Sequence, residues 1–304
     1  EHDPETGLIY FRNRYYSSIQ GRFLQRDPIG YVDGLGLYEG FGGNPNAWSD
    51  ALGLSTVDKL IEKYNERYGS GGEYFVGKLV RWTNELVRLS ERPAFTNPII
   101  GESKPYDKYP SSDSKLDTVV IEGDTAAWKR RLELFEELAE LLLDVCNEKH
   151  EKILKRINFT LLAGKALVHA INVNKELNKS NPDRVPQLKD FYEYLSKEGH
   201  KPSGGTLYTD GGTTYKGPAW NKLGGIKLLE EMGRFHESIH RGQNSRMNLV
   251  KAEIEAYGAE LKKYREFLEL ASEFQGNDFS SGYQNALDNI NNFLGKNEDF
   301  NKGF

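Results

Sequence analysis

The chain has 304 residues, of which 38% are hydrophobic and 28% are charged, and its formal net charge at pH 7 is −5. A chain of this length and composition has enough apolar side chains to bury a sizeable core. The acidic balance argues against a nucleic-acid partner, which usually requires a basic surface, and the single cysteine, Cys146, excludes an intrachain disulfide.

Residues 3–16, at the start of the segment 3–54, alternate turn formers with aromatic and aliphatic residues, a pattern typical of short strands. The segment contains DPETGLIYFRNRYY from residue 3, GRFLQRDPIG from residue 21 and NPNAWSDALGL from residue 44. It resembles the core that ends the repeat region of Rhs, or YD-repeat, proteins. The resemblance implies that residues 1–54 are a fragment of a β-rich Rhs core and that residues 55–304 form a toxin domain.

The same resemblance implies a self-cleavage site. Rhs cores end in a D-P-x-G-L signature, which here is DALGL at residues 50–54, with alanine in place of proline. By that resemblance Asp27 and Asp50 are the expected cleavage aspartates, and the cut is expected after Leu54. The alternative for both aspartates is the capping of turns.

Beyond residue 54 the apolar residues repeat at three- and four-residue steps in several stretches, which we predict to be helices. These stretches cover residues 60–68, 75–89, 128–145 and 157–173. Prolines break the pattern in an irregular arm at 92–124, with a short strand predicted at 118–121. The stretch 157–173 is too polar and too short to span a membrane, so a buried central helix is expected. His150 has no partner at ligand spacing and is predicted to lie on the surface.

Two further elements are predicted near the end of the chain. Residues 206–215 have the pattern of a β-hairpin with a glycine-rich turn. Apolar residues at helical steps between 228 and 239 predict a helix, with Gly242 as its C-terminal cap.

This last helix carries the most informative motif in the chain, His-Glu-Ser-Ile-His at residues 236–240. Histidines four residues apart lie on one face of a helix, so His236 and His240 can bind one ion. Glu237 between them is placed to deprotonate a water bound to that ion. The alternative is a helix with two surface histidines and a solvated glutamate.

A zinc site needs a third protein ligand, and the next predicted helix, at residues 250–268, supplies candidates. At about 100° per residue, Glu253 lies about 60° from the centre of the apolar stripe of that helix. Glu260 lies on the same flank, whereas Glu255 lies about 140° away among charged residues. Glu253 is therefore the first candidate, followed by Glu260 and then Glu255.

The two helices together resemble the gluzincin metallopeptidases, in which the third ligand is the glutamate of an E-x-x-A or E-x-x-S segment. That segment maps onto Glu253 and Ala256. The chain departs from the family at Tyr257, where an aspartate often orients a ligand histidine, so that role has no assigned residue. The longer metzincin pattern does not fit, because Gln243 replaces its glycine and Arg246 its last histidine.

The resemblance implies a zinc metalloendopeptidase toxin with Zn²⁺ as cofactor and Glu237 as the general base. Tyr257, Tyr264 and Arg241 are the candidates for the group that stabilises the oxyanion. The expected fold class is α+β, a short β-rich core remnant followed by a mainly α-helical zincin-like domain with a small hairpin. Within that domain, residues 55–200 are expected to form a helical subdomain and residues 201–304 the metallopeptidase core.

The two resemblances also imply partners and a location. The expected partners are a target-cell protein as substrate, a cognate immunity protein and the Rhs cage of the parent polypeptide. Neither nucleic acid nor stable membrane insertion is expected. A secreted effector acting in the target-cell cytoplasm is the implied location. Two alternatives stay open, namely a non-proteolytic toxin (pore former or binding module) and a zinc hydrolase of a non-peptide bond.

Overall fold

The computed structural model describes residues 3–11, 14–25, 38, 56–91, 124–145, 147–200, 205–210, 213–217, 219–244, 246–276, 279–298 and 300. The chain divides into two compact units, Glu1–Val80 and Arg81–Phe304. The described part is mainly helical, with one three-stranded and one two-stranded antiparallel sheet. The predicted α+β class is therefore confirmed.

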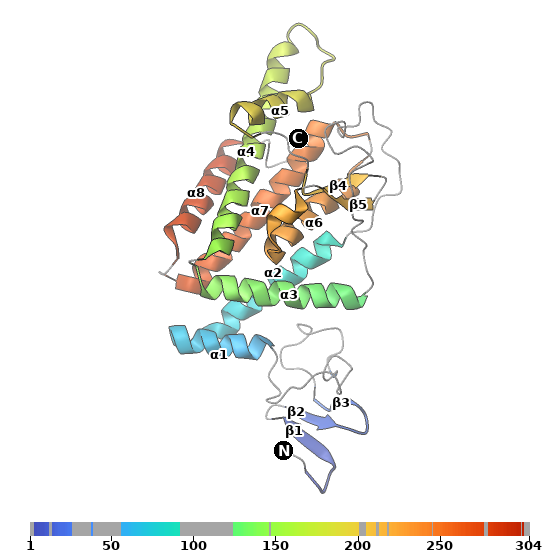
Figure 1. Cartoon of the computed structure of the whole chain (residues 1–304), viewed down its shortest axis with the longest axis vertical. Coiled ribbons are helices and arrows are strands. Elements are labelled where there is room, and N and C mark those ends of the chain that lie inside the picture. Colours follow the sequence, from blue (N-terminus) through green and yellow to red (C-terminus); the bar gives the residue numbers. More distant parts are fainter. Residues whose placement is uncertain are drawn as a thin grey trace. The chain divides into compact units, whose positions relative to one another are not determined.

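The first unit contains the three-stranded sheet, with strand order β1-β2-β3 (Figure 1). Its strands are β1 (Leu8–Phe11), β2 (Arg14–Ser17) and β3 (Arg22–Phe23). Tyr16 of β2 pairs with Phe23 of β3, and their buried rings meet edge to face at 5.5 Å. This small aromatic contact gives the short strands a core of their own.

Two helices follow, α1 (Thr56–Tyr68) and α2 (Gly72–Ser90), the second of which runs on into the second unit. Both predicted helices are confirmed, and each begins about one turn earlier than predicted. Apolar residues on one face of α1 are buried, among them Val57, Leu60 and Tyr64. The helices thus form as their amphipathic pattern requires.

The second unit is built on helices that pack around α7 (Figure 1). Its helices are α3 (Asp124–Leu143), α4 (Glu148–Leu177), α5 (Leu188–Lys197), α6 (Lys227–Gly242), α7 (Leu249–Gln275) and α8 (Ser281–Lys296). Helices α4, α7 and α8 pack against one another, α6 and α3 both pack on α7, and α5 folds back onto α4. Because α7 is surrounded by α3, α4, α6 and α8, and Phe267 also meets Trp82 of α2, its large side chains, including Tyr264 and Phe267, are fully buried.

Helix α4 confirms the predicted buried helix at 157–173, because Ile157, Ala163 and Leu167 are fully buried. Gly164 allows α4 to approach α8 closely. A Cβ atom built at this glycine would lie 2.8 Å from the Phe293 ring of α8. Among the helices that the structure describes, none combines the length and apolarity needed to cross a membrane.

The predicted hairpin is also confirmed, with strands β4 (Leu207–Asp210) and β5 (Thr213–Lys216). Leu207 pairs with Lys216 and Asp210 with Thr213, and β4 packs against α6. The buried Leu207 side chain lies 3.3 Å from the Cβ position of Gly233 on α6. The hairpin therefore covers one side of the helix that carries the His-Glu-Ser-Ile-His motif.

Two sequence predictions need correction. His150 is not on the surface but is buried, and its ring nitrogens contact Tyr283 Oη and the Asp144 carbonyl oxygen, because the first turn of α4 packs against α8. The cap of α6 is Gln243 and not Gly242, which is the last helical residue. The predicted strand at 118–121 lies outside the described residues, as does nearly all of the predicted arm.

Candidate metal centre

Helix α6 presents the motif from a helix that is buried along one side. Leu228, Met232 and Phe235 anchor that side in the core. The helix has no side-chain cap of its own at Ile226, and Glu137 of α3 replaces it by accepting a hydrogen bond from the Leu228 N–H at 2.8 Å. A carboxylate at this position also complements the helix dipole. The start of the metal helix is thus fixed by a neighbouring helix.

Helix α7 presents its polar side chains to α6 at steps of four and three residues. It begins at Asn248, whose side chain accepts hydrogen bonds from the N–H groups of Val250 and Lys251. From this start, Glu253, Tyr257 and Glu260 all lie on one face of the helix. Two carboxylates and a phenol ring are thereby directed at the histidines of α6.

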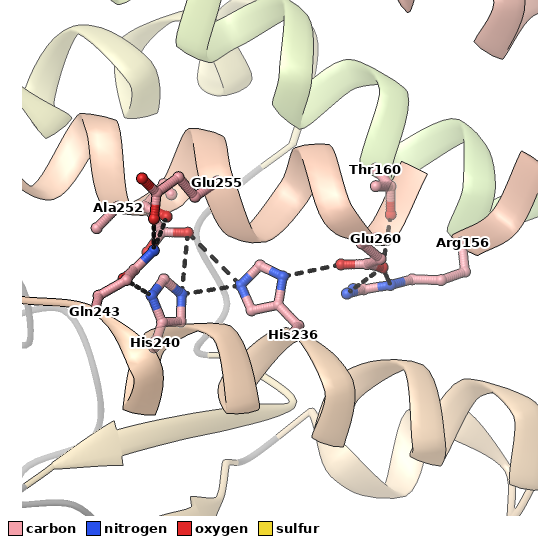
Figure 2. A network of polar contacts seen from close by, with 9 residues as sticks. Arg156, Thr160, His236, His240, Gln243, Ala252, Glu255 and Glu260 are labelled. Atoms are coloured by element: carbon pink, nitrogen blue, oxygen red, sulfur yellow. Dashed lines mark hydrogen bonds and ion pairs between the residues drawn. The ribbon is translucent and has the colours of Figure 1, made fainter. Parts of the chain in front are cut away.

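His236, His240 and Glu253 converge on one point. Figure 2 shows the rings of His236 and His240 side by side on α6. The two Nε2 atoms are 3.1 Å apart, and each lies 3.7 Å from the Glu253 Oε2 atom. Among the described residues, these three form a group of side chains that could together hold a metal ion. His236 is buried, whereas the side chains of His240 and Glu253 are 19% and 27% exposed, so water can reach the group from one side.

The geometry fits a single tetrahedral metal ion. With zinc–nitrogen and zinc–oxygen distances of about 2.0–2.1 Å, donor atoms around one zinc ion are about 3.3 Å apart. The three distances between the donor atoms of His236, His240 and Glu253 bracket that value. Two imidazoles and one carboxylate also leave a fourth position, as in catalytic zinc sites.

The Nδ1 atoms of both histidines, which point away from the other two ligands, have hydrogen-bond partners. His236 Nδ1 lies 3.0 Å from Glu260 Oε2, and His240 Nδ1 lies 2.9 Å from Gln243 Oε1. Glu260, the second ligand candidate, is thus placed behind His236 and not beside the Nε2 atoms. Glu255, the third candidate, accepts a hydrogen bond from Gln243 Nε2 at 3.0 Å.

The charges of the site favour a cation between the histidines and the carboxylates. Burial lowers the pKa of His236, but hydrogen bonds and charges from Glu253 and Glu260 outweigh burial and raise it to about 10. Burial raises the pKa of Glu253, but the two histidines outweigh it and hold that pKa below its ordinary value. In the metal-free protein, a proton on His236 therefore supplies the positive charge that a bound metal ion would otherwise supply.

The other predicted catalytic residues lie at different distances from this centre. Glu237 is 6% exposed. Burial lowers the pKa of His240, but the charge of Glu253 and, to a smaller extent, the charge of Glu237 raise it above its ordinary value. The Tyr257 ring meets the His236 ring edge to face at 4.6 Å. Arg241 points elsewhere, because its guanidinium donates to Thr214 Oγ1 and to the Ser90 carbonyl oxygen. Tyr264 is fully buried on α7.

Sequence reasoning missed the roles of three residues of the site, Gln243, Arg156 and Thr160, and it named Glu260 only as a possible ligand and not as the partner of His236. Gln243 stands three residues after His240, and Glu260 seven residues after Glu253, so helical spacing was an available signal for both. Arg156 and Thr160 lie on α4, and no spacing relates them to the motif. The expected self-cleavage residues Asp27, Asp50 and Leu54 lie outside the described residues.

Comparison with known proteins finds similarity over a quarter of the chain or less. The toxin subunit YenC2 of Yersinia entomophaga is 46% identical over 55 residues, which are 18% of this chain and 6% of that protein. The "Probable deoxyribonuclease RhsA" of Dickeya dadantii is 37% identical over 76 residues, 25% of this chain and 5% of its own. The double-stranded DNA deaminase toxin A of Burkholderia cenocepacia is 42% identical over 53 residues, 17% and 4% respectively.

These partial similarities support the presence of an Rhs-type toxin region in the chain. The chain spans only a small part of the length of these three relatives. No family model matches the chain, and no solved structure matches it.

The expectations about the substrate are wrong. A protein substrate and the absence of nucleic acid were expected, whereas the relatives named deoxyribonuclease and DNA deaminase toxin point to nucleic-acid substrates. The expectation failed because it relied on the net charge of −5, which is a sum over the whole chain. Such a sum says nothing about where basic side chains gather.

Proposed function

We propose that the chain is part of an Rhs-type toxin whose α6 and α7 helices form a zinc-dependent hydrolytic centre. The observation that carries the proposal is the convergence of His236 Nε2, His240 Nε2 and Glu253 Oε2 within 4.8 Å of one another. Both histidines also have a hydrogen-bond partner at Nδ1, as metal-bound histidines usually do. The two features together are what a histidine pair that holds a metal ion requires.

A bound zinc ion would supply Lewis acidity, which polarises the scissile group and makes water easier to deprotonate. Glu237 follows His236 directly on α6 and is buried, so few solvent molecules compete with the attacking water for hydrogen bonds to its carboxylate. It would accept the proton of the attacking water and return it to the leaving group. Tyr257, whose ring contacts His236, is the first candidate for stabilising the oxyanion.

The arrangement favours attack on a carbon–nitrogen bond. Nucleases that cleave phosphodiesters often use two metal ions about 3.5–4 Å apart. The described residues contain one group of three ligands, enough for one ion. A single zinc ion with a glutamate base is the arrangement with which zinc metallopeptidases hydrolyse amides. This ligand set and the gluzincin resemblance therefore support amide-type hydrolysis by one zinc ion, without specifying that the substrate is a protein.

A second candidate is favoured by the names of the relatives. Zinc-dependent deaminases of nucleobases also break a carbon–nitrogen bond with a glutamate as general acid and base. Their zinc ligands are a histidine and two cysteines or three cysteines, whereas this chain has a single cysteine. A deaminase would therefore use a different ligand set here.

The test is a comparison of the wild-type chain with Glu237→Gln, both loaded with one equivalent of zinc. Single- and double-stranded DNA, RNA and a mixed peptide library are incubated with each protein. Mass spectrometry then detects deaminated bases and cut peptides, and gels detect strand breaks. We expect hydrolysis of a carbon–nitrogen bond that falls by about 10²- to 10⁴-fold in Glu237→Gln, with zinc still bound.

The outcomes separate the candidates. Glu237-dependent cleavage of amide bonds supports the metallopeptidase, and Glu237-dependent deamination supports the nucleobase enzyme. Glu237-dependent strand breaks would overturn the assignment of the bond while keeping a hydrolytic centre. A wild-type chain that binds no zinc would overturn the centre itself.

A further inference from the structure

We propose that Glu260 is the positioning residue of His236 and that helix α4, through Arg156 and Thr160, fixes Glu260 in place. This inference rests on the proposed metal centre. It fills the role left open at Tyr257, where gluzincins often carry an aspartate. The carboxylate comes instead from a position seven residues after Glu253, and its support comes from a helix about a hundred residues earlier in the chain.

The two oxygens of Glu260 have separate partners (Figure 2). Oε2 lies 3.0 Å from His236 Nδ1. Oε1 accepts hydrogen bonds from Thr160 Oγ1 at 2.9 Å and from Arg156 Nε and Nη2 at 3.3 and 3.2 Å. Glu260 has no exposed surface. A carboxylate held at both oxygens and shielded from water has one orientation available.

This arrangement selects the tautomer of His236. An ionised carboxylate only accepts hydrogen bonds, so Nδ1 of His236 carries the proton in that contact. In the neutral ring the lone pair is then on Nε2, which faces His240 Nε2 and Glu253 Oε2. Arg156 and Thr160 thereby act on the metal ligand through Glu260, without touching the ion.

His240 is oriented in the same sense by a neutral group. Gln243 Nε2 donates to the Ala252 carbonyl oxygen at 2.8 Å and to Glu255 Oε2 at 3.0 Å. Because the amide nitrogen faces these two acceptors, the amide oxygen faces His240 Nδ1. Both histidines thus direct Nε2 to the same point. The partner of His236 is charged and buried, so Glu260 is expected to contribute more than Gln243.

The chain contains a matched control for the loss of a buried carboxylate. Glu231 on α6 is 1% exposed and is paired with Arg130 Nε at 2.7 Å, with Arg234 Nε at 3.5 Å and with the Ser90 hydroxyl at 2.9 Å. It therefore has the same kinds of partner as Glu260, an arginine and a hydroxyl. None of these partners is a proposed metal ligand.

The experiment compares Glu260→Gln with Glu231→Gln in the full chain. Zinc affinity is measured by competition with a chromophoric chelator, and the cobalt-substituted proteins are compared by their visible spectra. Thermal unfolding of the metal-free proteins reports their folding. We expect zinc binding to weaken by about 10- to 100-fold in Glu260→Gln, with an altered cobalt spectrum. Glu231→Gln is expected to unfold at a lower temperature but to bind zinc like the wild type.

A milder variant covers the case in which Glu260→Gln does not fold. Thr160→Val keeps the carboxylate and the ion pair with Arg156 but removes one hydrogen bond, and we expect a smaller loss of zinc affinity.

If the wild type binds zinc and both Glu260→Gln and Thr160→Val bind it equally well, the positioning role is overturned and the metal centre stands. Equal weakening in Glu231→Gln would assign the effect to general destabilisation and also overturn the role. A wild type that does not bind zinc would overturn both proposals.

Discussion

At the scale of single residues, His236 couples the protonation of the site to the stability of the metal-free protein. Burial works against its protonation, but Glu253 and Glu260 raise its pKa to about 10, above the ordinary value of 6.5. A raised pKa in the folded state adds stability that is fully present below about pH 6.5 and is lost as the pH rises through about 10. We therefore expect the melting temperature of the metal-free wild type to fall across this window.

Other groups also titrate in alkaline solution, so the control is the variant His236→Asn. This variant lacks the ionising group, and we expect its melting temperature to fall less between pH 6.5 and 10 than that of the wild type. The measurement is thermal unfolding in the presence of a chelator at several pH values. Parallel curves for the two proteins would contradict the assignment of the raised pKa to His236.

Much of the site could be predicted from helical spacing alone, because two adjacent helices carry it. The four-residue step of the histidines and the angular position of Glu253 on the next helix indicated three residues that the structure brings together. The role of Glu260 could not be predicted in the same way. Its orientation depends on Arg156 and Thr160, and only the packing of α4 on α7 brings these residues to it.

At the scale of elements, α3 caps the metal helix through Glu137. Its carboxylate is 8% exposed and accepts a hydrogen bond from the Leu228 N–H at the start of α6. We expect Glu137→Ala to lower the free energy of unfolding by about 1 to 2 kcal/mol, as the loss of a helix cap does. Denaturant unfolding measures the change. Glu136→Ala, an exposed neighbour on the same helix, should leave stability nearly unchanged.

The contact between α4 and α8 makes a second prediction at this scale. A methyl group at Gly164 would lie 2.8 Å from the Phe293 ring, which is itself packed against Phe300. We expect Gly164→Ala to destabilise the protein by about 1 to 3 kcal/mol, the usual cost of overpacking a core. Gly295→Ala on the exposed side of α8 meets nothing within 4 Å and should be neutral or stabilising. Equal melting temperatures of the two variants would show that the ring moves aside.

The helices themselves were predictable where the apolar residues follow a regular step. This holds for α1, α2, α3, α4, α6 and α7, which were all predicted. Helix α8 has the same signal in Tyr283, Leu287 and Ile290, although no helix was predicted there. The environment of His150 was not predictable, because its burial depends on Tyr283 of α8, far along the chain. Local pattern thus determined the helices, and long-range packing determined the polar contacts inside them.

At the scale of the whole molecule, each reported relative matches only a part of the chain, and most of the chain lies outside each of these matches. The three relatives named above match 17 to 25% of the chain, and their names describe different activities. Such a distribution is what one shared segment with different neighbouring domains would give. The activity of this chain therefore has to be argued from the site on α6 and α7, not from the shared segment.

The metal centre also predicts the behaviour of the whole chain on metal removal. The ligands come from two helices that are 27 and 16 residues long and that pack against each other, so zinc would bind the folded but not the unfolded chain in this geometry. At a free zinc concentration 100 times the dissociation constant, the gain in stability is about 2.7 kcal/mol. We expect the melting temperature of the full chain to rise with zinc and to return to its starting value with a chelator.

His240→Ala should abolish the rise, whereas Glu237→Gln should keep it, because Glu237 is the proposed base and not a ligand. A rise of equal size in His240→Ala would locate the zinc elsewhere in the chain.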